Sequence, residues 1–275
     1  MQPLPLQQKL TRLRQIFAGM DSVLVAYSGG IDSTVVLKVA YDQLKDRAVG
    51  ITALSPTFPA SELEVATRVA EEIGVRHELI ETDQLKIPAF AENDASRCFH
   101  CKTDLYQLLG TLRAAHAGSI IVDGTNLDDL GDDRPGIKAA REWGVRSPLV
   151  EAGLSKAEIR TLAQELGLSN WDKPAAACLS SRIPRGITIT REKLSRIEQA
   201  EAVLQGEGFR HYRVRDHGEI ARIEVGQDEL ARLTEHERGL RISRKLKELG
   251  FRFVTIDLEG YRPGGVSLGS PRPAR

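Results

Sequence analysis

The pattern of apolar and polar positions predicts alternating strands and helices over the first two-thirds of the chain. Apolar residues recur every three or four positions over 6–18, as on one face of an amphipathic helix. Val23–Tyr27 is a short apolar run typical of a buried parallel strand, and a helical pattern follows to residue 44. The alternation continues with strands at 48–54, 77–80 and 119–122, and with helices at 61–73, 105–112 and 155–167. This order predicts an α/β fold with a doubly wound parallel sheet.

After Gly186 the pattern changes to that of a smaller α+β unit. It predicts helices at 191–207 and 228–248, and strands at 210–215, 219–225 and 250–258. We therefore expect a parallel-sheet domain over 1–186 and a small α+β domain over 187–262. Residues 263–275 are rich in proline and glycine, and we expect them to form a disordered tail.

The composition argues against nucleic-acid-binding, membrane-spanning and disulfide-rich classes of protein. The 275 residues include 38 basic and 38 acidic side chains, so the net charge is zero and no strong overall field favours nucleic acid or an anionic membrane. No apolar run is long enough to span a membrane, and the first residues lack a secretory signal pattern. Three cysteines are too few, and odd in number, for a disulfide scaffold. We expect a soluble cytoplasmic protein with neither nucleic acid nor membrane as partner.

The segment Ser28–Thr34 (SGGIDST) is the strongest candidate site. It lies between a buried strand and the start of a helix, where backbone N–H groups are unpaired and the helix dipole favours anions. Gly29 and Gly30 let the backbone curl around an anion, and Ser28, Ser33 and Thr34 add hydroxyl donors. Asp32 is suited either to orienting the loop or to holding Mg²⁺. We therefore predict a phosphate-binding loop.

Ligands in a doubly wound sheet lie beyond the carboxyl ends of the strands, at the switch point. This places Ser55 after the second strand, and Gly124, Asn126 and Asp129 after the fourth, near a bound nucleotide. The acidic residues Asp128, Asp132 and Asp133 of the same segment are equally consistent with a solvated loop.

The cysteines allow several interpretations. Cys98 and Cys101 form a C-x-x-C motif in a polar stretch ahead of a helix, and Cys178 lies in a later loop of small residues. The pair could be a redox couple or, with His100, a zinc site, although neither context is typical. All three thiolates could instead hold one iron–sulfur cluster and leave one iron open. Three unrelated buried cysteines are the remaining alternative.

The Ser-Gly-Gly-x-Asp-Ser element between strand and helix resembles the pyrophosphate loop (PP-loop) of the N-type ATP pyrophosphatases. That superfamily includes NAD synthetase, GMP synthetase and tRNA thiolation enzymes, and the resemblance covers residues 20–186. It implies that ATP is cleaved between its α- and β-phosphates, that the loop and Mg²⁺ stabilise the leaving pyrophosphate, and that AMP activates an acceptor oxygen.

More specific motifs resemble the LarE family of sulfur transferases, which mature the nickel-pincer cofactor of lactate racemase. They are residues 132–136 (DDRPG), 163–167 (AQELG), 178–184 (CLSSRIP) and 213–224 (RVRDHGEIARIE). This resemblance covers about residues 10–262 and includes motifs outside the nucleotide-binding core.

The LarE resemblance implies a two-stage reaction. A carboxylate of pyridinium-3,5-biscarboxylic acid mononucleotide is adenylated, and sulfur then replaces AMP to give a thiocarboxylate. Members with three cysteines are expected to carry a 4Fe–4S cluster, here on Cys98, Cys101 and Cys178, that binds sulfide from a separate sulfur donor. In the alternative, Cys178 gives up its own sulfur and becomes dehydroalanine. The resemblance also implies a symmetric homo-oligomer.

Charged residues of the second domain are candidates for substrate binding. Arg213 and Arg215 alternate along a strand and so share one face, and their guanidinium groups suit the substrate phosphate. Pairing with acidic neighbours is the alternative. Arg182 is expected to neutralise thiolate or phosphate charge near Cys178. The family resemblance assigns Glu201 and Glu224 to a divalent cation, although surface carboxylates remain an equal alternative.

Other functions remain open from the sequence alone. A PP-loop tRNA thiolase would use the same loop, but it should show a basic groove or RNA-binding modules. An amidotransferase-type synthetase would not need three cysteines. A nucleotide sensor or iron–sulfur carrier without turnover is the non-enzymatic alternative.

Overall fold

The computed structural model describes residues 4–116, 118–131, 135–174 and 177–262. The chain forms two compact units, the first made of residues 1–84 and 96–176 and the second of residues 85–95 and 177–275. The division therefore falls ahead of the boundary expected after Gly186, and the second unit also takes in residues 85–95. The expected tail at 263–275 and the acidic pair Asp132–Asp133 lie outside the described residues.

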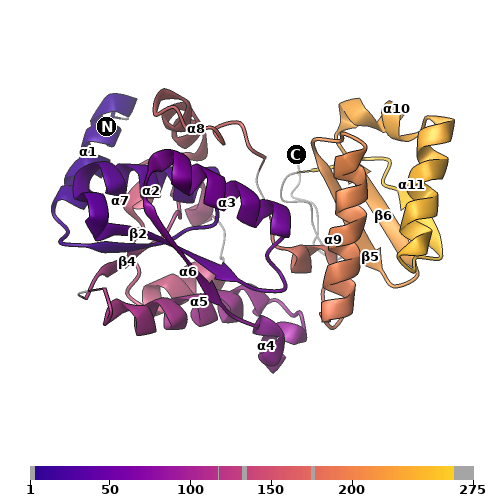
Figure 1. Ribbon diagram of the computed structural model, residues 1–275, viewed down its shortest axis with the longest axis horizontal. Helices are drawn as coiled ribbons and strands as arrows, with labels where there is room; N and C mark the ends of the chain where they lie inside the picture. Colours follow the sequence, from indigo (N-terminus) through magenta and orange to yellow (C-terminus); the bar gives the residue numbers. More distant parts are fainter. Residues whose placement is uncertain (1–3, 117, 132–134, 175–176, 263–275) are drawn as a thin grey trace. The chain divides into compact units, whose positions relative to one another are not determined.

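The first unit is built on a four-stranded parallel sheet in the order β3-β2-β1-β4. Figure 1 shows this sheet, with β2 and β4 labelled, among the helices of the unit. The strands are β1 (Val23–Ala26), β2 (Ala48–Leu54), β3 (Arg76–Glu81) and β4 (Ile120–Val122). The helices are α1 (Leu6–Ala18), α2 (Ile31–Leu44), α3 (Ala60–Ile73), α5 (Arg97–Arg113), α6 (Pro135–Glu142), α7 (Pro148–Glu151) and α8 (Lys156–Glu165). The predicted α/β class, parallel sheet and helix–strand alternation are confirmed.

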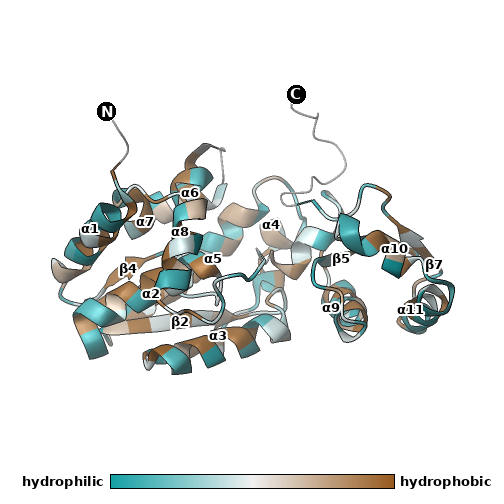
Figure 2. Ribbon diagram, turned by 90° about the horizontal axis from the view of Figure 1, so that it is seen from above, coloured by the Kyte–Doolittle hydropathy of each residue, from teal (hydrophilic) through white to brown (hydrophobic). Residues whose placement is uncertain are grey.

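Helices cover both faces of this sheet because alternate strand residues point to opposite sides. Val23 and Val25 of β1 belong to one hydrophobic core with residues of α1, α2, α3, α7 and α8. Leu24, between them, belongs to a second core with Tyr106 of α5 and Ala139 of α6. The helices of the outer layers carry apolar and polar stripes, seen as brown and teal bands on α1 and α3 (Figure 2).

The strand order fixes where a ligand can approach. From β1 the chain first builds outward through β2 and β3, and it then crosses to the other side of β1 for β4. The carboxyl ends of β1 and β4 therefore flank the switch point of the sheet, where doubly wound folds bind ligands. The segments Tyr27–Gly30 and Asp123–Asn126 begin at these two ends.

The second unit has a three-stranded sheet in the order β5-β6-β7, with β5 antiparallel and β7 parallel to β6. Its elements are α4 (Pro88–Ala91), α9 (Arg191–Gly206), β5 (Tyr212–His217), β6 (Ile220–Val225), α10 (Leu230–Leu233), α11 (His236–Glu248) and β7 (Phe253–Ile256). The continuous helix expected over 228–248 was wrong, since the chain leaves helical structure at Thr234 and Glu235 between α10 and α11.

Asn93 ties the early segment 85–95 into the second unit. Its side-chain amide donates to the carbonyl oxygens of Ile183, Pro184 and Ile187, and its own carbonyl accepts from the Gly186 N–H. Asn93 is fully buried and has a left-handed backbone conformation (φ 59°), which asparagine tolerates better than most residues. Within the described ranges, no helix is both long and apolar enough to cross a membrane.

Candidate active site

The predicted phosphate loop joins β1 to α2 in the conformation that its sequence suggests. Gly29 has φ 69°, and Gly30 forms the N-cap of α2 in extended conformation. The Ser33 hydroxyl donates to the Gly30 carbonyl (3.0 Å) and accepts from the Ser28 N–H (3.2 Å). The Thr34 hydroxyl also donates to the Gly30 carbonyl (2.9 Å). These bonds close the loop over the start of the helix and define its curvature.

Two close approaches show why this site needs glycine. A Cβ on Gly29 would lie 2.8 Å from the Cβ of Ala66 in α3. A Cβ on Gly124, at the end of β4, would lie 2.8 Å from the backbone nitrogen of Ser33. The backbone of Gly124, just after β4, therefore packs directly against the first turn of α2.

Asp32 pairs with a lysine that the sequence analysis did not identify. Its Oδ2 accepts from the Lys156 ammonium, while its Oδ1 is buried and has no hydrogen-bond partner among the described residues. Burial raises the pKa of Asp32, and Lys156 offsets this only in part. The loop thus holds a carboxylate whose ionised form the fold disfavours and whose second oxygen has no partner in the described part of the chain.

This raised pKa has a consequence for stability. Asp32 holds its proton more tightly in the folded chain, so its contribution favours folding below its unfolded pKa and declines as pH rises through the folded pKa. Asp32→Asn, which cannot ionise, is therefore expected to unfold at higher urea concentration than wild type at about pH 8, with the difference shrinking toward about pH 4. Urea unfolding followed by circular dichroism at both pH values measures it.

Glu158 provides a control of opposite sign. Burial alone would raise the pKa of Glu158, but hydrogen bonds from Lys9 and Ser155 outweigh burial and the pKa is lowered. Glu158→Gln should therefore lose stability at about pH 8. If Asp32→Asn were no more stable than wild type at about pH 8, the fold would not disfavour the ionised form of Asp32.

Lys156 reaches the loop from the first position of α8. A capping box formed by Ser155 and Glu158 defines the start of this helix. The Lys156 backbone N–H also donates to Asp128 of the segment after β4. The start of α8 is thus bonded to the first turn of α2 and to the segment that follows β4, on the two sides of the switch point.

The segment after β4 is held mainly by its own polar groups. Asn126 is buried, its backbone N–H donates to Asp129 (3.1 Å), and its side-chain oxygen accepts from the Asp128 N–H (2.9 Å). Asp123 accepts from Tyr106, Thr125 and Ser147. These residues therefore shape the turn that presents Gly124.

Ser55 follows β2, as predicted, and its hydroxyl is engaged locally. It contacts the Thr57 hydroxyl at 2.9 Å and accepts from the Thr57 N–H at 3.3 Å. Ser55 therefore forms a turn at the carboxyl end of β2.

Cys98 and Cys101 lie in the first two turns of α5, and not in the preceding polar stretch where we expected them. Three residues apart on a helix, their side chains share one face. The Arg97 guanidinium lies 4.0 Å from the Cys98 sulfur. Lys102 follows directly, and the charges of Tyr106, Asp123 and both thiols raise its pKa, despite an opposing effect of burial. The two cysteines form no disulfide, and the cationic side chains of Arg97 and Lys102 lie near them.

Cys178 belongs to the second unit and precedes a short 3₁₀ turn, Leu179–Arg182. Its sulfur lies 3.0 Å from the Ser180 hydroxyl. Arg182 is buried and donates to the carbonyl oxygens of Ala177 (2.6 Å) and Cys178 (2.9 Å). Its other side makes a two-bond pair with Glu201, at 2.8 and 2.9 Å. Arg182 therefore positions the backbone of Cys178.

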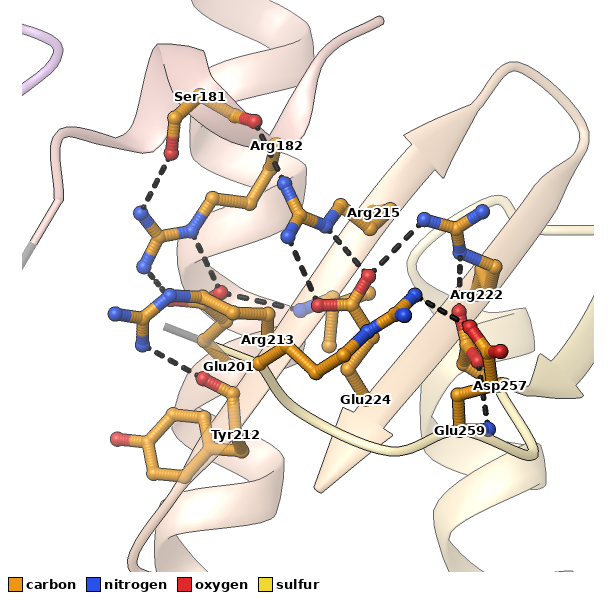
Figure 3. A network of polar contacts seen from close by, with 12 residues as sticks. Ser181, Arg182, Glu201, Tyr212, Arg213, Arg215, Arg222, Glu224, Asp257 and Glu259 are labelled. Atoms are coloured by element: carbon orange, nitrogen blue, oxygen red, sulfur yellow. Dashed lines mark hydrogen bonds and ion pairs between the residues drawn. The ribbon is translucent and has the colours of Figure 1, made fainter. Parts of the chain in front are cut away.

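A second such pair lies beside it (Figure 3). Arg215 donates to both oxygens of Glu224, at 2.8 and 2.9 Å, and to the Ser181 carbonyl. Arg222 adds a third bond to Glu224. Arg182 and Arg215 thus bind carboxylates, so holding a substrate phosphate would require exchange of these partners.

Arg213 differs from the other predicted arginines. It donates to the Tyr212 carbonyl (2.7 Å) and stacks 5.0 Å from the ring centre of Tyr261. Burial and the nearby charge of Arg182 lower the pKa of Arg213. An anion at this position would offset both effects.

Glu201 and Glu224 were the predicted ligands of a divalent cation. Each instead forms an ion pair with an arginine, Glu201 with Arg182 and Glu224 with Arg215. Glu201 also accepts from the Val214 N–H (3.1 Å). Among the residues that the structure describes, no three His, Cys, Asp or Glu side chains lie together as a metal site would require. The observed role of the two glutamates is therefore ion pairing within the second unit.

The fold and the loop define the class of protein. A parallel sheet with a Ser-Gly-Gly loop at its switch point is the arrangement of a PP-loop domain. A family model described as asparagine synthase matches residues 19–93, which contain the loop and the strands β1 to β3.

Three relatives extend the match to most of the chain. An uncharacterized protein of Synechocystis sp. is 46% identical over 95% of this chain and 98% of its own length. A pyridinium-3,5-bisthiocarboxylic acid mononucleotide synthase of Lactiplantibacillus plantarum is 39% identical over 90% of each chain. An uncharacterized protein of Methanocaldococcus jannaschii is 31% identical over 87% of this chain and 90% of its own. The chain therefore belongs to the pyridinium-3,5-bisthiocarboxylic acid mononucleotide synthase family, which confirms the resemblance to LarE.

Proposed function

We propose that the protein uses ATP to adenylate the carboxylates of pyridinium-3,5-biscarboxylic acid mononucleotide and then replaces AMP with sulfur. In the first stage a carboxylate oxygen bonds to the α-phosphorus and pyrophosphate leaves. In the second, sulfur bonds to the acyl carbon and AMP leaves. The product named for the Lactiplantibacillus relative supports this small molecule, and not tRNA, as the acceptor.

The observation that carries the proposal is the loop at Ser28–Thr34. Its curvature is set by Gly29 and by the bonds of Ser33 and Thr34, and it lies at the amino end of α2. Such an arrangement stabilises the negative charge that develops on leaving pyrophosphate. Lys156, bonded to Asp32, supplies a cation beside the same loop.

One feature of the phosphate loop suits a bound Mg²⁺ ion. The Oδ1 atom of Asp32 is buried without a hydrogen-bond partner in the described part of the chain, and carboxylate oxygen is the ligand that Mg²⁺ prefers. Asp32 would therefore contribute to holding the ion. When bound, Mg²⁺ supplies positive charge to the phosphate oxygens.

The cysteines fit an iron–sulfur cluster by their donor chemistry. Cys98 and Cys101 offer two thiol groups on one helical turn, near Arg97 and Lys102, and Cys178 would have to join them from the second unit. A 4Fe–4S cluster held by three cysteines supplies an iron to which sulfide can bind. Arg213, whose charge the fold disfavours, is our candidate for the substrate phosphate.

Pyrophosphate release tests the function. The purified protein, ATP and Mg²⁺ should release pyrophosphate only when the biscarboxylate mononucleotide is present, and mass spectrometry should then detect the thiocarboxylate. Nucleotide binding without substrate-dependent release would contradict the proposal and support a sensor without turnover.

A separate experiment distinguishes the two sulfur sources. After anaerobic purification, wild type is expected to contain about four irons per chain. Cys98→Ala, Cys101→Ala and Cys178→Ala should each lose them, whereas Thr103→Ala, on the same helix, should not. Absence of iron from wild type, together with conversion of Cys178 to dehydroalanine on turnover, would contradict the cluster and establish Cys178 as the donor.

A further inference from the structure

The polar residues around the phosphate loop include two that lie far from it in sequence and have no role in the function described so far. They are Asn170 and Lys173, in the segment that follows α8. Both contact the same atom, the carbonyl oxygen of Gly29. The Asn170 side-chain nitrogen donates to it at 3.0 Å, and the Lys173 ammonium lies at 3.5 Å.

Asn170 is the stronger of the two contacts. The side chain is buried, and its nitrogen also donates to the Thr34 hydroxyl at 2.9 Å. Thr34 in turn donates to the Gly30 carbonyl. The orientation of the amide is fixed, because a carbonyl oxygen such as that of Gly29 can only accept a hydrogen bond. Asn170 therefore bridges the loop and the first turn of α2.

This contact determines the direction of a peptide group. In a trans peptide the carbonyl and the following N–H point in opposite directions. Anchoring the Gly29 carbonyl to Asn170 therefore turns the Gly30 N–H away from Asn170. Between two glycines a peptide can rotate with little steric cost. Rotation would replace the N–H with a carbonyl oxygen, which repels phosphate.

Lys173 supports the same carbonyl from a second direction. Its ammonium forms an ion pair with Glu62 of α3 at 2.7 Å, and both side chains are largely buried. The pair fixes the ammonium next to the loop. Lys173 can therefore reinforce the Gly29 contact.

We propose that Asn170 is a positioning residue that keeps the Gly29–Gly30 peptide in its phosphate-binding orientation, with Lys173 as a second anchor. The inference rests on the proposed use of ATP by this loop. It adds that the loop is not preorganised by its own sequence alone. A segment some 140 residues downstream supplies the donors that orient it.

Calorimetric binding of α,β-methylene-ATP, which cannot release pyrophosphate, tests the inference on the full chain. Asn170→Leu removes the donor without adding charge, and about tenfold weaker binding is expected. Glu62→Gln/Lys173→Met removes the second anchor without leaving a buried charge unpaired, and it should also weaken binding. Thr161→Ala, at an exposed position of α8 whose hydroxyl donates to Ala157 of the same helix, should bind like wild type.

Binding and stability together separate positioning from a merely structural role. In the substrate assay, Asn170→Leu should raise the KM for ATP more than it lowers kcat. If Asn170→Leu and the double variant lose stability yet bind the analogue within twofold of wild type, the inference is overturned. If wild type itself does not bind the analogue, ATP use by this loop fails, and the inference fails with it.

Discussion

Gly29→Ala is expected to reduce substrate-dependent pyrophosphate release about a hundredfold, as a displacement of about 1 Å at a reacting group does. Two effects combine at this position. An alanine at φ 69° is strained, at a cost of about 1 kcal/mol, and its Cβ would lie 2.8 Å from the Cβ of Ala66. Since Ala66 is fully buried in α3, the loop must move instead. The carbonyl that Asn170 anchors then moves with it.

Gly167→Ala is the matched control. Gly167 has φ 68° and lies after α8, and a Cβ there would meet no atom within 4 Å. It carries the same backbone strain without the collision. Pyrophosphate release should therefore stay close to that of wild type, while the urea midpoint falls modestly. Equal loss of turnover in both variants would attribute the effect to backbone strain and contradict the loop displacement.

Features with a local sequence signal could be predicted from the sequence alone. The phosphate loop was predictable because its signals are local: a buried strand, two glycines, hydroxyl residues and a helix start, in order. The short apolar runs of β1, β2 and β4 and the capping box at Ser155 are local in the same sense. These patterns placed the switch point correctly.

The residues that orient the loop carry no such signal. Lys156, Asn170 and Lys173 contact it across more than 120 positions of sequence, and each has ordinary neighbours in its own segment. Only the packing of α8 and the following segment against α2 brings them to the loop. Their role depends on the tertiary fold, so no local pattern could have identified it.

The binding partners of individual charged residues were the hardest feature to predict from residue type. Arginine suits phosphate and glutamate suits metal ions, but each also suits the other. Arg182 and Glu201 are 19 positions apart, so the sequence could not show that they bond to each other. The C-x-x-C motif was likewise recognised, but its place in the first two turns of α5 was not, because the polar residues around it lack a helical apolar stripe.

The Arg182–Glu201 pair yields a second large effect, on stability. Its side chains are 3% and 11% exposed, and the pair is joined by two hydrogen bonds. Arg182→Met leaves a buried carboxylate without its partner, and Glu201→Gln leaves a buried guanidinium. Each is expected to lower the free energy of unfolding by about 3–5 kcal/mol. Urea unfolding at neutral pH measures the loss.

Arg241 and Glu207 form the matched control pair in the same unit. Their two bonds are equally short, at 2.8 and 2.7 Å, but the Arg241 side chain is 47% exposed. Arg238 also pairs with Glu207, at 3.8 Å, so the carboxylate keeps a cationic partner and Arg241→Met should cost much less than Arg182→Met. Similar losses in Arg182→Met and Arg241→Met would show that burial is not the deciding factor.

The same measurement distinguishes an ion pair from a metal site at Glu201. If Glu201 serves mainly to hold Arg182, replacing both by uncharged residues in Arg182→Met/Glu201→Leu should recover much of the lost stability, since no buried charge is then left alone. EDTA should leave the unfolding of wild type unchanged. If a resident cation at Glu201 stabilised the fold, EDTA would lower the urea midpoint. The double variant would then stay as unstable as Glu201→Gln, because the site would remain destroyed.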